Sequence, residues 1–404
     1  KESGEASGIE SISDLHMVNI VPRIRQLVDA VLPRGAVRWD VPFVGIENVP
    51  RVVVVSEHMN ATYFATFHYT LQYLQSQNVL DFAMLSGAGV ERALSHCRPD
   101  ALVEWLVNST TPQIVIFSRY AAPCAKALLE AFQSHRVPVL YYCDDNLLDL
   151  PDTLGSGVIA AHGTEPVRDA RRFCLARVDR VLASTGYLAT RLRTQFPSQR
   201  VTEICYPPYL ASLIRKASRK DDRRSDKQVT IGYMGSRGHQ GDLEMVVPTI
   251  MHILRQFQHV RFETFGTVAM PTSLRCFGEK VAAHSPRRTY GEFLQFQYDL
   301  GWDIGLAPLK DNDFNRCRSP IKFVEYTACD IVTVASDMNV YSSVGGCNPG
   351  LVVDEHGWGA VLEQLVMDTD FRWACLSRAR SICAERYHLP DVSRGLAKAM
   401  TLGG

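Results

Sequence analysis

The chain has no excess of charge of either sign, because its 404 residues contain 43 Lys and Arg and 43 Asp and Glu. Non-specific nucleic-acid binding needs a strong basic excess, so the composition argues against a nucleic-acid partner. No apolar run approaches the ~20 residues of a membrane-spanning helix. The first 14 residues are polar and acidic, unlike a cleavable signal peptide. These absences favour a globular cytoplasmic protein.

Several motifs of known chemistry are also missing. The 11 cysteines include no C-x-x-C pair, which argues against a disulfide framework or a structural zinc site and favours a reducing compartment. The histidines form no H-E-x-x-H zinc motif. Neither the G-x-S-x-G of α/β-hydrolases nor the G-x-x-x-x-G-K-[ST] phosphate loop occurs. The glycines of Gly232–Asp242 are spaced wrongly for a dinucleotide fingerprint, so a dehydrogenase is disfavoured.

Short apolar runs alternate with helical patterns in two halves of the chain, as in doubly wound α/β domains. The first domain is predicted over 51–212 and the second over 229–385. Ligands of such sheets bind at the carboxyl ends of the strands, so we expect a cleft there between the domains. The predicted strands are 51–55, 82–85, 114–117, 137–142, 180–183 and 202–205, then 229–233, 260–265, 303–307, 331–335 and 351–353.

Three segments lie outside these domains. Residues 1–50 are predicted as a tail with a peripheral helix over 15–31. Residues 213–228 are predicted as a linker; within it, Arg215–Lys227 holds seven basic and three acidic residues. This stretch fits a solvated linker, and alternatively a basic patch that touches an anionic lipid surface. Residues 386–404 form a C-terminal tail.

The segment Asn315–Tyr326 (NRCRSPIKFVEY) carries the clearest chemical signal. Ser319 is predicted as the N-cap of a helix, followed by Pro at the favoured first position. The free N–H groups of a helix start bind anions, and Arg318 and Lys322 add two cations suited to a diphosphate. Glu325 lies one turn further on the same face and can accept hydrogen bonds from a ribose. The alternative is a surface helix with a Lys–Glu pair.

Two further segments follow predicted strands. In Gly232–Asp242 (GYMGSRGHQGD) the glycines permit a tight turn whose N–H groups face a phosphate. Asp242 is predicted as the next helix's N-cap, and Arg237 and His239 are ligand contacts or solvent-exposed loop residues. In Tyr141–Pro151 (YYCDDNLLDLP), Asp144 and Asp145 point toward the cleft for acid–base work, with loop capping or a metal site as alternatives. Arg119 opens into the same cleft or forms a surface ion pair.

Together these segments resemble the donor-binding domain of nucleotide-sugar glycosyltransferases of family 4, over roughly 229–390. The resemblance rests on WDIGLAPL from Trp302, on Asn315–Tyr326 and on IVTVAS from Ile331. It is looser in the first half, where a polysaccharide-building subgroup has segments similar to Ile114–Arg119, Tyr141–Pro151 and Arg180–Thr185. The resemblance implies the GT-B fold of two Rossmann-like domains, with the C-terminal tail crossing back to the first domain.

The resemblance also implies roles for individual residues. The donor diphosphate would be bound by Lys322 with Arg318 or Arg237, and Glu325 matches the second Glu of the family's Glu-x7-Glu motif, which holds the ribose. The first Glu of that motif is replaced by Cys317. The family's N-domain His is not evident, and Arg119 stands in that region. The candidate catalytic residues are Arg119, Asp144, Asp145 and His239; the candidate donor-binding residues are Gly235, Ser236, Arg237, Arg318, Ser319, Lys322 and Glu325.

The resulting hypothesis is a retaining hexosyl- or deoxyhexosyltransferase that needs no metal or other cofactor. It would move a sugar from a nucleotide-diphosphate donor to a growing bacterial-type glycan, free or lipid-linked, in the cytoplasm and peripherally at the inner membrane. Three alternatives stay open. They are a catalytically inactive GT-B module that binds a glycan or a protein, a sugar-nucleotide epimerase, and a transferase of a CMP-activated acid sugar.

Overall fold

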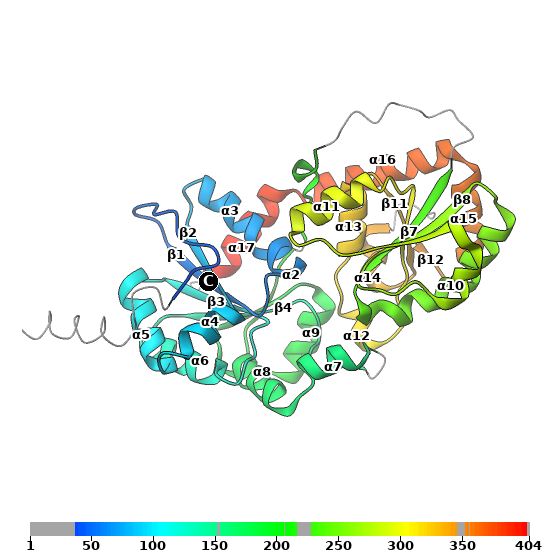
Figure 1. Ribbon diagram of the computed structural model, residues 1–404. Helices are drawn as coiled ribbons and strands as arrows, with labels where there is room; N and C mark the ends of the chain where they lie inside the picture. The colour runs from blue at the N-terminus through cyan, green and yellow to red at the C-terminus, as the bar shows by residue number, and fades with distance from the viewer. Residues whose placement is uncertain are drawn as a thin grey trace, which may run out of the picture.

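The computed structural model describes residues 37–151, 154–205, 207–215, 228–345, 352–354 and 356–401. Two α/β domains lie side by side in it, which confirms the predicted fold class (Figure 1). The predicted helix over 15–31 and residues 216–227 of the charged linker lie outside the described residues. Residues 37–50 belong with the first domain, because Val41 forms an antiparallel bridge to Met84 of its sheet.

The first domain is built on a six-stranded parallel sheet with the order β2-β1-β3-β4-β5-β6. Residues Val52–Val55 are all buried, as expected for a strand covered on both faces. The strands are β1 (Arg51–Ser56), β2 (Asp81–Ser86), β3 (Ile114–Ser118), β4 (Val139–Cys143), β5 (Arg180–Ala183) and β6 (Val201–Glu203).

Helices cover both faces of this sheet (Figure 1). Helices α4, α5, α6, α8 and α9 pack on one face, and the helical segment over 61–76 packs on the other. The elements are α2 (Ala61–Tyr63), the π-helical turn η1 (Phe64–His68), α3 (Tyr69–Ser76), α4 (Gly87–Leu94), α5 (Pro99–Thr110), α6 (Ala125–Ser134), α7 (Ser156–His162), α8 (Glu165–Arg177), α9 (Gly186–Gln195) and the 3-10 turn η3 (Ala211–Leu213).

The second domain has a parallel sheet with the order β12-β11-β10-β7-β8-β9. Its edge strand β9 was not predicted, because its four residues are partly exposed and carry no long apolar run. The strands are β7 (Val229–Gly235), β8 (Val260–Gly266), β9 (Val281–His284), β10 (Ile304–Ala307), β11 (Val332–Ser336) and β12 (Val352–Val353).

The second sheet is likewise covered on both faces, mainly by α10 and α15 on one side and α11 on the other. The elements are the 3-10 turn η4 (Arg237–His239), α10 (Gln240–Gln256), the 3-10 segment η5 (Thr272–Lys280), α11 (Tyr290–Asp299), α12 (Asp313–Arg316), α13 (Ile321–Ala328), α14 (Asn339–Gly345), α15 (Trp358–Met367) and α16 (Thr369–Arg386).

The C-terminal helix α17 (Leu389–Met400) lies against the first domain, beside α3 (Figure 1). Its residues Leu396, Ala399 and Met400 belong to the buried cluster formed by the first sheet and α3. Arg180 Nη1 donates hydrogen bonds to the carbonyl oxygens of Ala399 (2.8 Å) and Thr401 (3.0 Å). Helix α17 therefore completes the hydrophobic core of the first domain.

The strand orders fix where a ligand can bind. In the first sheet, the strands that follow β1 in the sequence are added first on one side of it and then, from β3 onward, on the other side. The second sheet has the same kind of switch between β7 and β10. At such a switch point the loops after the two strands diverge and leave a crevice. The loops after β1, β3, β7 and β10 are therefore the ones expected to form the site. Within the described part of the chain, no helix is long and apolar enough to cross a membrane.

Candidate active site

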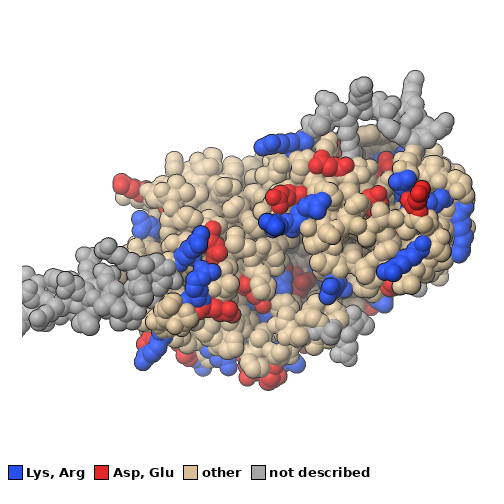
Figure 2. All heavy atoms as spheres, viewed as in Figure 1, with Lys and Arg blue, Asp and Glu red and all other residues tan. Residues whose placement is uncertain are grey.

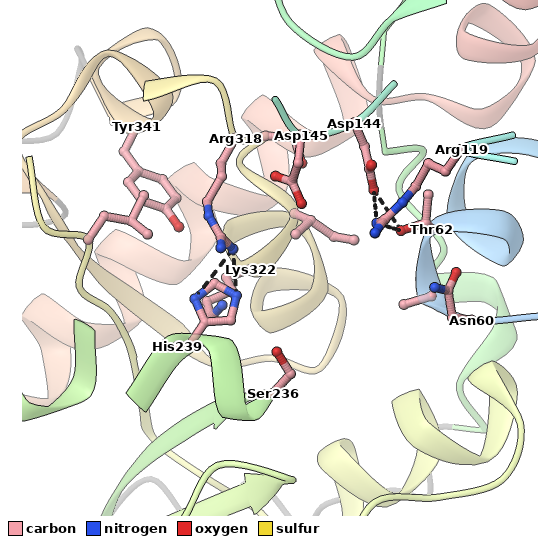
Figure 3. A pocket seen from close by; sticks show the side chains of 14 residues that line it. Asn60, Thr62, Arg119, Asp144, Asp145, Ser236, His239, Arg318, Lys322 and Tyr341 are labelled. Atoms are coloured by element: carbon pink, nitrogen blue, oxygen red, sulfur yellow. Dashed lines mark hydrogen bonds and ion pairs between the residues drawn. The ribbon is translucent and has the colours of Figure 1, made fainter. Parts of the chain in front are cut away.

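A cavity of about 290 Å³ lies between the domains, at both switch points. Figure 2 shows this face hollowed between the two halves, with acidic and basic side chains inside the hollow. Residues from both domains line the cavity (Figure 3). They are Asn60, Ala61, Thr62, Arg119, Asp144 and Asp145 from the first domain, and Ser236, His239, Leu309, Arg318, Ser319, Ile321, Lys322 and Tyr341 from the second.

The second-domain wall contains the start of α13 and two cations. The helix begins at Ile321 with Pro320 as its N-cap, so the prediction that Ser319 caps it is wrong. The fixed φ of proline suits the start of a helix, and this places Ser319 in the loop that lines the cavity. The N-cap provides no side-chain hydrogen bond, so the first turn keeps N–H groups available for an anion.

Lys322 lies in that first turn and is only 6% exposed, yet it lines the cavity. Its Nζ lies 5.8 Å from the centre of the Tyr233 ring. Burial and then the neighbouring Arg318 lower the pKa of Lys322 to about 8, and the carboxylates nearby only partly offset this. An anion in the cavity would therefore relieve the repulsion between the two cations.

His239 connects Arg318 to the interior of the second domain (Figure 3). Arg318 Nη1 donates to His239 Nε2 at 2.6 Å, and His239 Nδ1 donates to Asp242 Oδ2 at 3.1 Å. Burial, then Arg318 and Lys322, lower the pKa of His239 to about 3, so the ring is neutral and can accept this bond. Both ring nitrogens are thus engaged.

Asp242 anchors this chain of hydrogen bonds, and the prediction that it is the N-cap of α10 is wrong. His239 occupies the cap position, and Asp242 lies in the first turn. Its Oδ1 accepts hydrogen bonds from the backbone N–H of Lys310 (3.0 Å) and from Asn315 Nδ2 (3.1 Å). Burial raises the pKa of Asp242, but the bond from His239 and its other partners outweigh burial and lower it overall. The loops after β7 and β10 are held together through this carboxylate.

On the first-domain wall, Arg119 directly follows β3 and has a φ of 57°. A residue other than glycine is strained in this left-handed backbone conformation, and it keeps that conformation only where the surrounding structure holds it. Arg119 Nη1 donates to Asp144 Oδ2 at 3.2 Å, and its Nε lies 3.7 Å from Glu57 Oε2. Burial alone would lower the pKa of Arg119, but Asp144, Asp145 and Glu57 together raise it.

Asp145 extends into the space between Arg318 and Arg119 (Figure 3). Its carboxylate makes no hydrogen bond or ion pair to any residue that the structure describes. Burial raises the pKa of Asp145, and Arg318 partly counteracts this. By contrast, Asp144 Oδ2 accepts hydrogen bonds from Thr62 Oγ1 (2.6 Å) and Arg119. The two adjacent acids are therefore not equivalent, because Asp144 is held through Oδ2, whereas the Asp145 carboxylate has no such contact.

Three predicted site residues do not line the cavity. Glu325 is 4% exposed, and its Oε1 accepts a hydrogen bond from Tyr290 Oη at 2.7 Å. Burial raises the pKa of Glu325 to about 7. Arg237 is exposed, and Gly235 is the last residue of β7, where its carbonyl oxygen accepts a hydrogen bond from the N–H of Val268. The other eight predicted residues all line the cavity.

Comparisons with known proteins concern the fold. The chain matches no known protein-family model and no curated protein. Among solved structures it is similar to WaaG, a glycosyltransferase involved in lipopolysaccharide biosynthesis, at 12% identity and a TM-score of 0.57, over 88% of this chain and all of WaaG. It is also similar to TarM of S. aureus (10% identity, TM-score 0.53) over 75% of this chain, spanning 58% of the length of TarM.

The chain has the GT-B fold. A third similar structure is a putative UDP-N-acetylglucosamine 2-epimerase from Listeria monocytogenes, at 10% identity and a TM-score of 0.52, over 87% of this chain and 95% of that one. The GT-B fold therefore accounts for the two domains and the cavity between them. The donor, the acceptor and the reaction depend on the residues in the cavity.

Within this GT-B frame, Cys317 faces away from the cavity. It is fully buried among residues of the first domain's core, and its carbonyl oxygen accepts a hydrogen bond from Thr185 Oγ1 at 2.9 Å. Burial raises the pKa of its thiol to about 12, so the group is un-ionised. The position that resembles the family's first Glu thus holds the domains together.

Sequence reasoning missed several residues around the cavity. Asn60 and Thr62 lie at the N-terminal end of the helical segment over 61–76, where Asn60 is the N-cap. The available signal was that Asn is a favoured N-cap residue. His162 ends α7, and its Nε2 lies 3.4 Å from Arg119 Nη2, while Nδ1 lies 3.3 Å from Glu57 Oε1. Nothing in the local sequence marks this contact.

Proposed function

We propose that this chain is a glycosyltransferase that takes a hexosyl or deoxyhexosyl group from a nucleotide-diphosphate sugar. One observation supports this most directly: Arg318, Lys322 and the start of α13 converge on one wall of the cavity. A diphosphate diester carries two negative charges, which these two cations balance. Free N–H groups at a helix start add hydrogen bonds without ordering a further side chain. We assign Ser236 and Ser319, which also line the cavity, to donate hydroxyl hydrogen bonds to the same group.

In this proposal, the second-domain wall of the cavity also assists the transfer of the sugar. As the bond between the sugar and the diphosphate breaks, negative charge grows on the leaving phosphate, and fixed cations stabilise it. We assign Arg318 and Lys322 to this task and His239 to holding Arg318 in place. The sugar then lies against the first-domain wall of Arg119, Asp144 and Asp145. The transfer proceeds with retention at the anomeric carbon.

No metal is needed in this proposal. The two cations perform the charge neutralisation that a divalent ion performs elsewhere. The described residues contain no group of three or more His, Cys, Asp or Glu side chains able to hold a metal ion. The acceptor is a growing glycan, free or carried on a lipid. One crystal structure of a TarM mutant is a complex that includes UDP, which supports a nucleotide ligand for a fold of this kind.

A second candidate function is nucleotide-sugar epimerisation, which the similarity to the putative Listeria epimerase favours. A third is a non-catalytic binding module, favoured by the burial of Cys317 away from the cavity. Product analysis separates the three, since a transferase releases nucleotide only with an acceptor, an epimerase converts the sugar without one, and a binding module does neither.

The test is calorimetric titration of the full chain with UDP, GDP, dTDP, ADP and CMP, each with and without EDTA. We expect one diphosphate to bind equally well in both conditions. Arg318→Ala and Lys322→Ala should each weaken that binding at least tenfold, about 1.4 kcal/mol. Arg316→Ala is the matched control, because Arg316 ends α12 two residues before Arg318, pairs with Asp311 and does not line the cavity. Binding that survives both substitutions, or that EDTA abolishes, would contradict the proposal.

A further inference from the structure

The two walls of the cavity differ in charge balance. On the second-domain wall, Arg318 and Lys322 are the cations that line the cavity, and His239 is neutral. If the proposed function holds, a bound diphosphate uses both positive charges. No surplus cation then remains among the described residues of this wall for a third negative charge on the sugar.

The described part of the first-domain wall offers no free cation either. The guanidinium of Arg119 is shared between Asp144, at 3.2 Å, and Glu57, at 3.7 Å. Two carboxylates thus face a single guanidinium, so Arg119 is not left to bind a carboxylate of a ligand. Its Nη1 also donates to Thr62 Oγ1 at 3.5 Å, and that hydroxyl in turn donates to Asp144, so this part of the wall is engaged internally.

Asp145 adds a negative charge at the same place, which Arg318 and Arg119 offset only in part. Its carboxylate extends between the two walls, as Figure 3 shows, and has no hydrogen-bond or ion-pair partner among the described residues. A carboxylate accepts hydrogen bonds from sugar hydroxyls and ammonium groups, and it repels another carboxylate at close range. A sugar that reaches from the diphosphate toward Arg119 must pass Asp145.

We propose that this cavity selects sugars without a carboxylate, and that Asp145 is the residue that excludes acidic sugars. This inference rests on the proposed function and narrows its donor to neutral or amino sugars. It also excludes the alternative that the protein is a transferase of CMP-activated acid sugars, because those donors carry a carboxylate on the carbon that is transferred. Asp145 is a specificity-determining residue in this assignment, acting through charge at the sugar.

The experiment compares matched sugar conjugates of whichever nucleoside diphosphate the protein binds. For uridine, the probes are UDP-glucose, UDP-glucuronate and UDP itself, titrated calorimetrically at pH 8, where carboxylates are ionised. We expect UDP-glucuronate to bind at least about tenfold more weakly than UDP-glucose. Asp145→Asn keeps the size of the side chain and removes its charge, and it should reduce this difference to less than about threefold. Any change in the affinity for UDP should be smaller than the change in the affinity for UDP-glucuronate.

Asp149→Asn is the charge-matched control. Asp149 is an exposed residue of the same loop, outside the cavity, and its loss should leave the tenfold difference intact. Equal affinity of the wild-type protein for both conjugates overturns the inference, and so does an unchanged difference in Asp145→Asn. Binding of CMP conjugates alone also overturns it. Failure to bind any nucleotide is a different result, because it removes the proposed function itself.

Discussion

His239 shows how the role of one side chain follows from what its two ring nitrogens contact. The spacing of its segment favours a ligand contact or a catalytic group, and its ring does line the cavity. Arg318 and Asp242 nevertheless engage both nitrogens, and a pKa lowered to about 3 keeps the ring neutral over the physiological range. A neutral ring that accepts from a guanidinium orients the cation, and it is a poor general acid.

We therefore predict that His239→Ala weakens nucleotide-diphosphate binding about tenfold, because Arg318 loses the acceptor that orients it. The amide of His239→Gln reaches about the position of Nε2 and should restore binding to within about threefold. Calorimetric titration of both variants measures this. A proton-transfer role would give the opposite pattern, with intact nucleotide binding and low kcat in His239→Gln.

Lys322 gives the site a pH dependence. Its pKa is lowered to about 8, so the ammonium is charged below that pH and neutral above it. Since the charged form binds the diphosphate, affinity for a nucleotide sugar should fall as the pH rises through 8, by about tenfold between pH 7 and 9.5. The diphosphate diester itself does not titrate in this range. Titrations at several pH values measure the decrease.

Two variants check the origin of this decrease. Lys322→Arg keeps a positive charge at all these pH values and should abolish it. Arg318→Ala removes a neighbouring cation that lowers the pKa of Lys322, so the decrease should move to higher pH although binding is weaker overall. An unchanged midpoint in Arg318→Ala would show that another group titrates.

At the scale of elements, helix α17 belongs to a domain from which it is far removed in sequence. Its Leu396 is buried in the first domain's core beside α3. We predict that Leu396→Ala lowers the free energy of unfolding of that domain by about 2–4 kcal/mol, through lost apolar burial and a residual cavity. Urea denaturation followed by circular dichroism measures this change.

Lys398→Ala is the control on the same helix, since Lys398 is exposed; it should change stability by less than about 0.5 kcal/mol. A similar small effect of Leu396→Ala would show that α17 is detached from the first domain in solution.

At the scale of the whole molecule, the domains meet through Cys317, which is fully buried against the first domain, and through Thr185, which bonds its carbonyl. We predict that Cys317→Glu destabilises the protein by about 3 kcal/mol or more, because a carboxylate would be buried there without a partner. Cys317→Ala should cost about 1 kcal/mol. Calorimetric unfolding measures both, and a fully stable Cys317→Glu protein would show that the domains separate at this contact.

The sequence by itself determined the fold class. Strands that are buried on both faces are continuous apolar runs, and the helices between them show apolar residues at helical spacing. The sequence also indicated eight of the cavity residues, because polar residues directly after such strands fall at the carboxyl ends of a parallel sheet, and because Arg318, Ser319 and Lys322 surround a predicted helix start. It misplaced the caps of α10 and α13, because Ser319 and Asp242 suit an N-cap and only the local chain path decides which residue takes that position.

Only the tertiary structure decided which loops meet. Glu325 is bound by Tyr290, which lies 35 residues away, and Arg119 meets His162 across 43 residues. Each pair lies within one domain and depends on how the strands of that domain's sheet are ordered, which no local pattern of residues encodes. The charge balance that leaves Asp145 without a partner among the described residues, and Arg119 engaged, is a property of those contacts between loops.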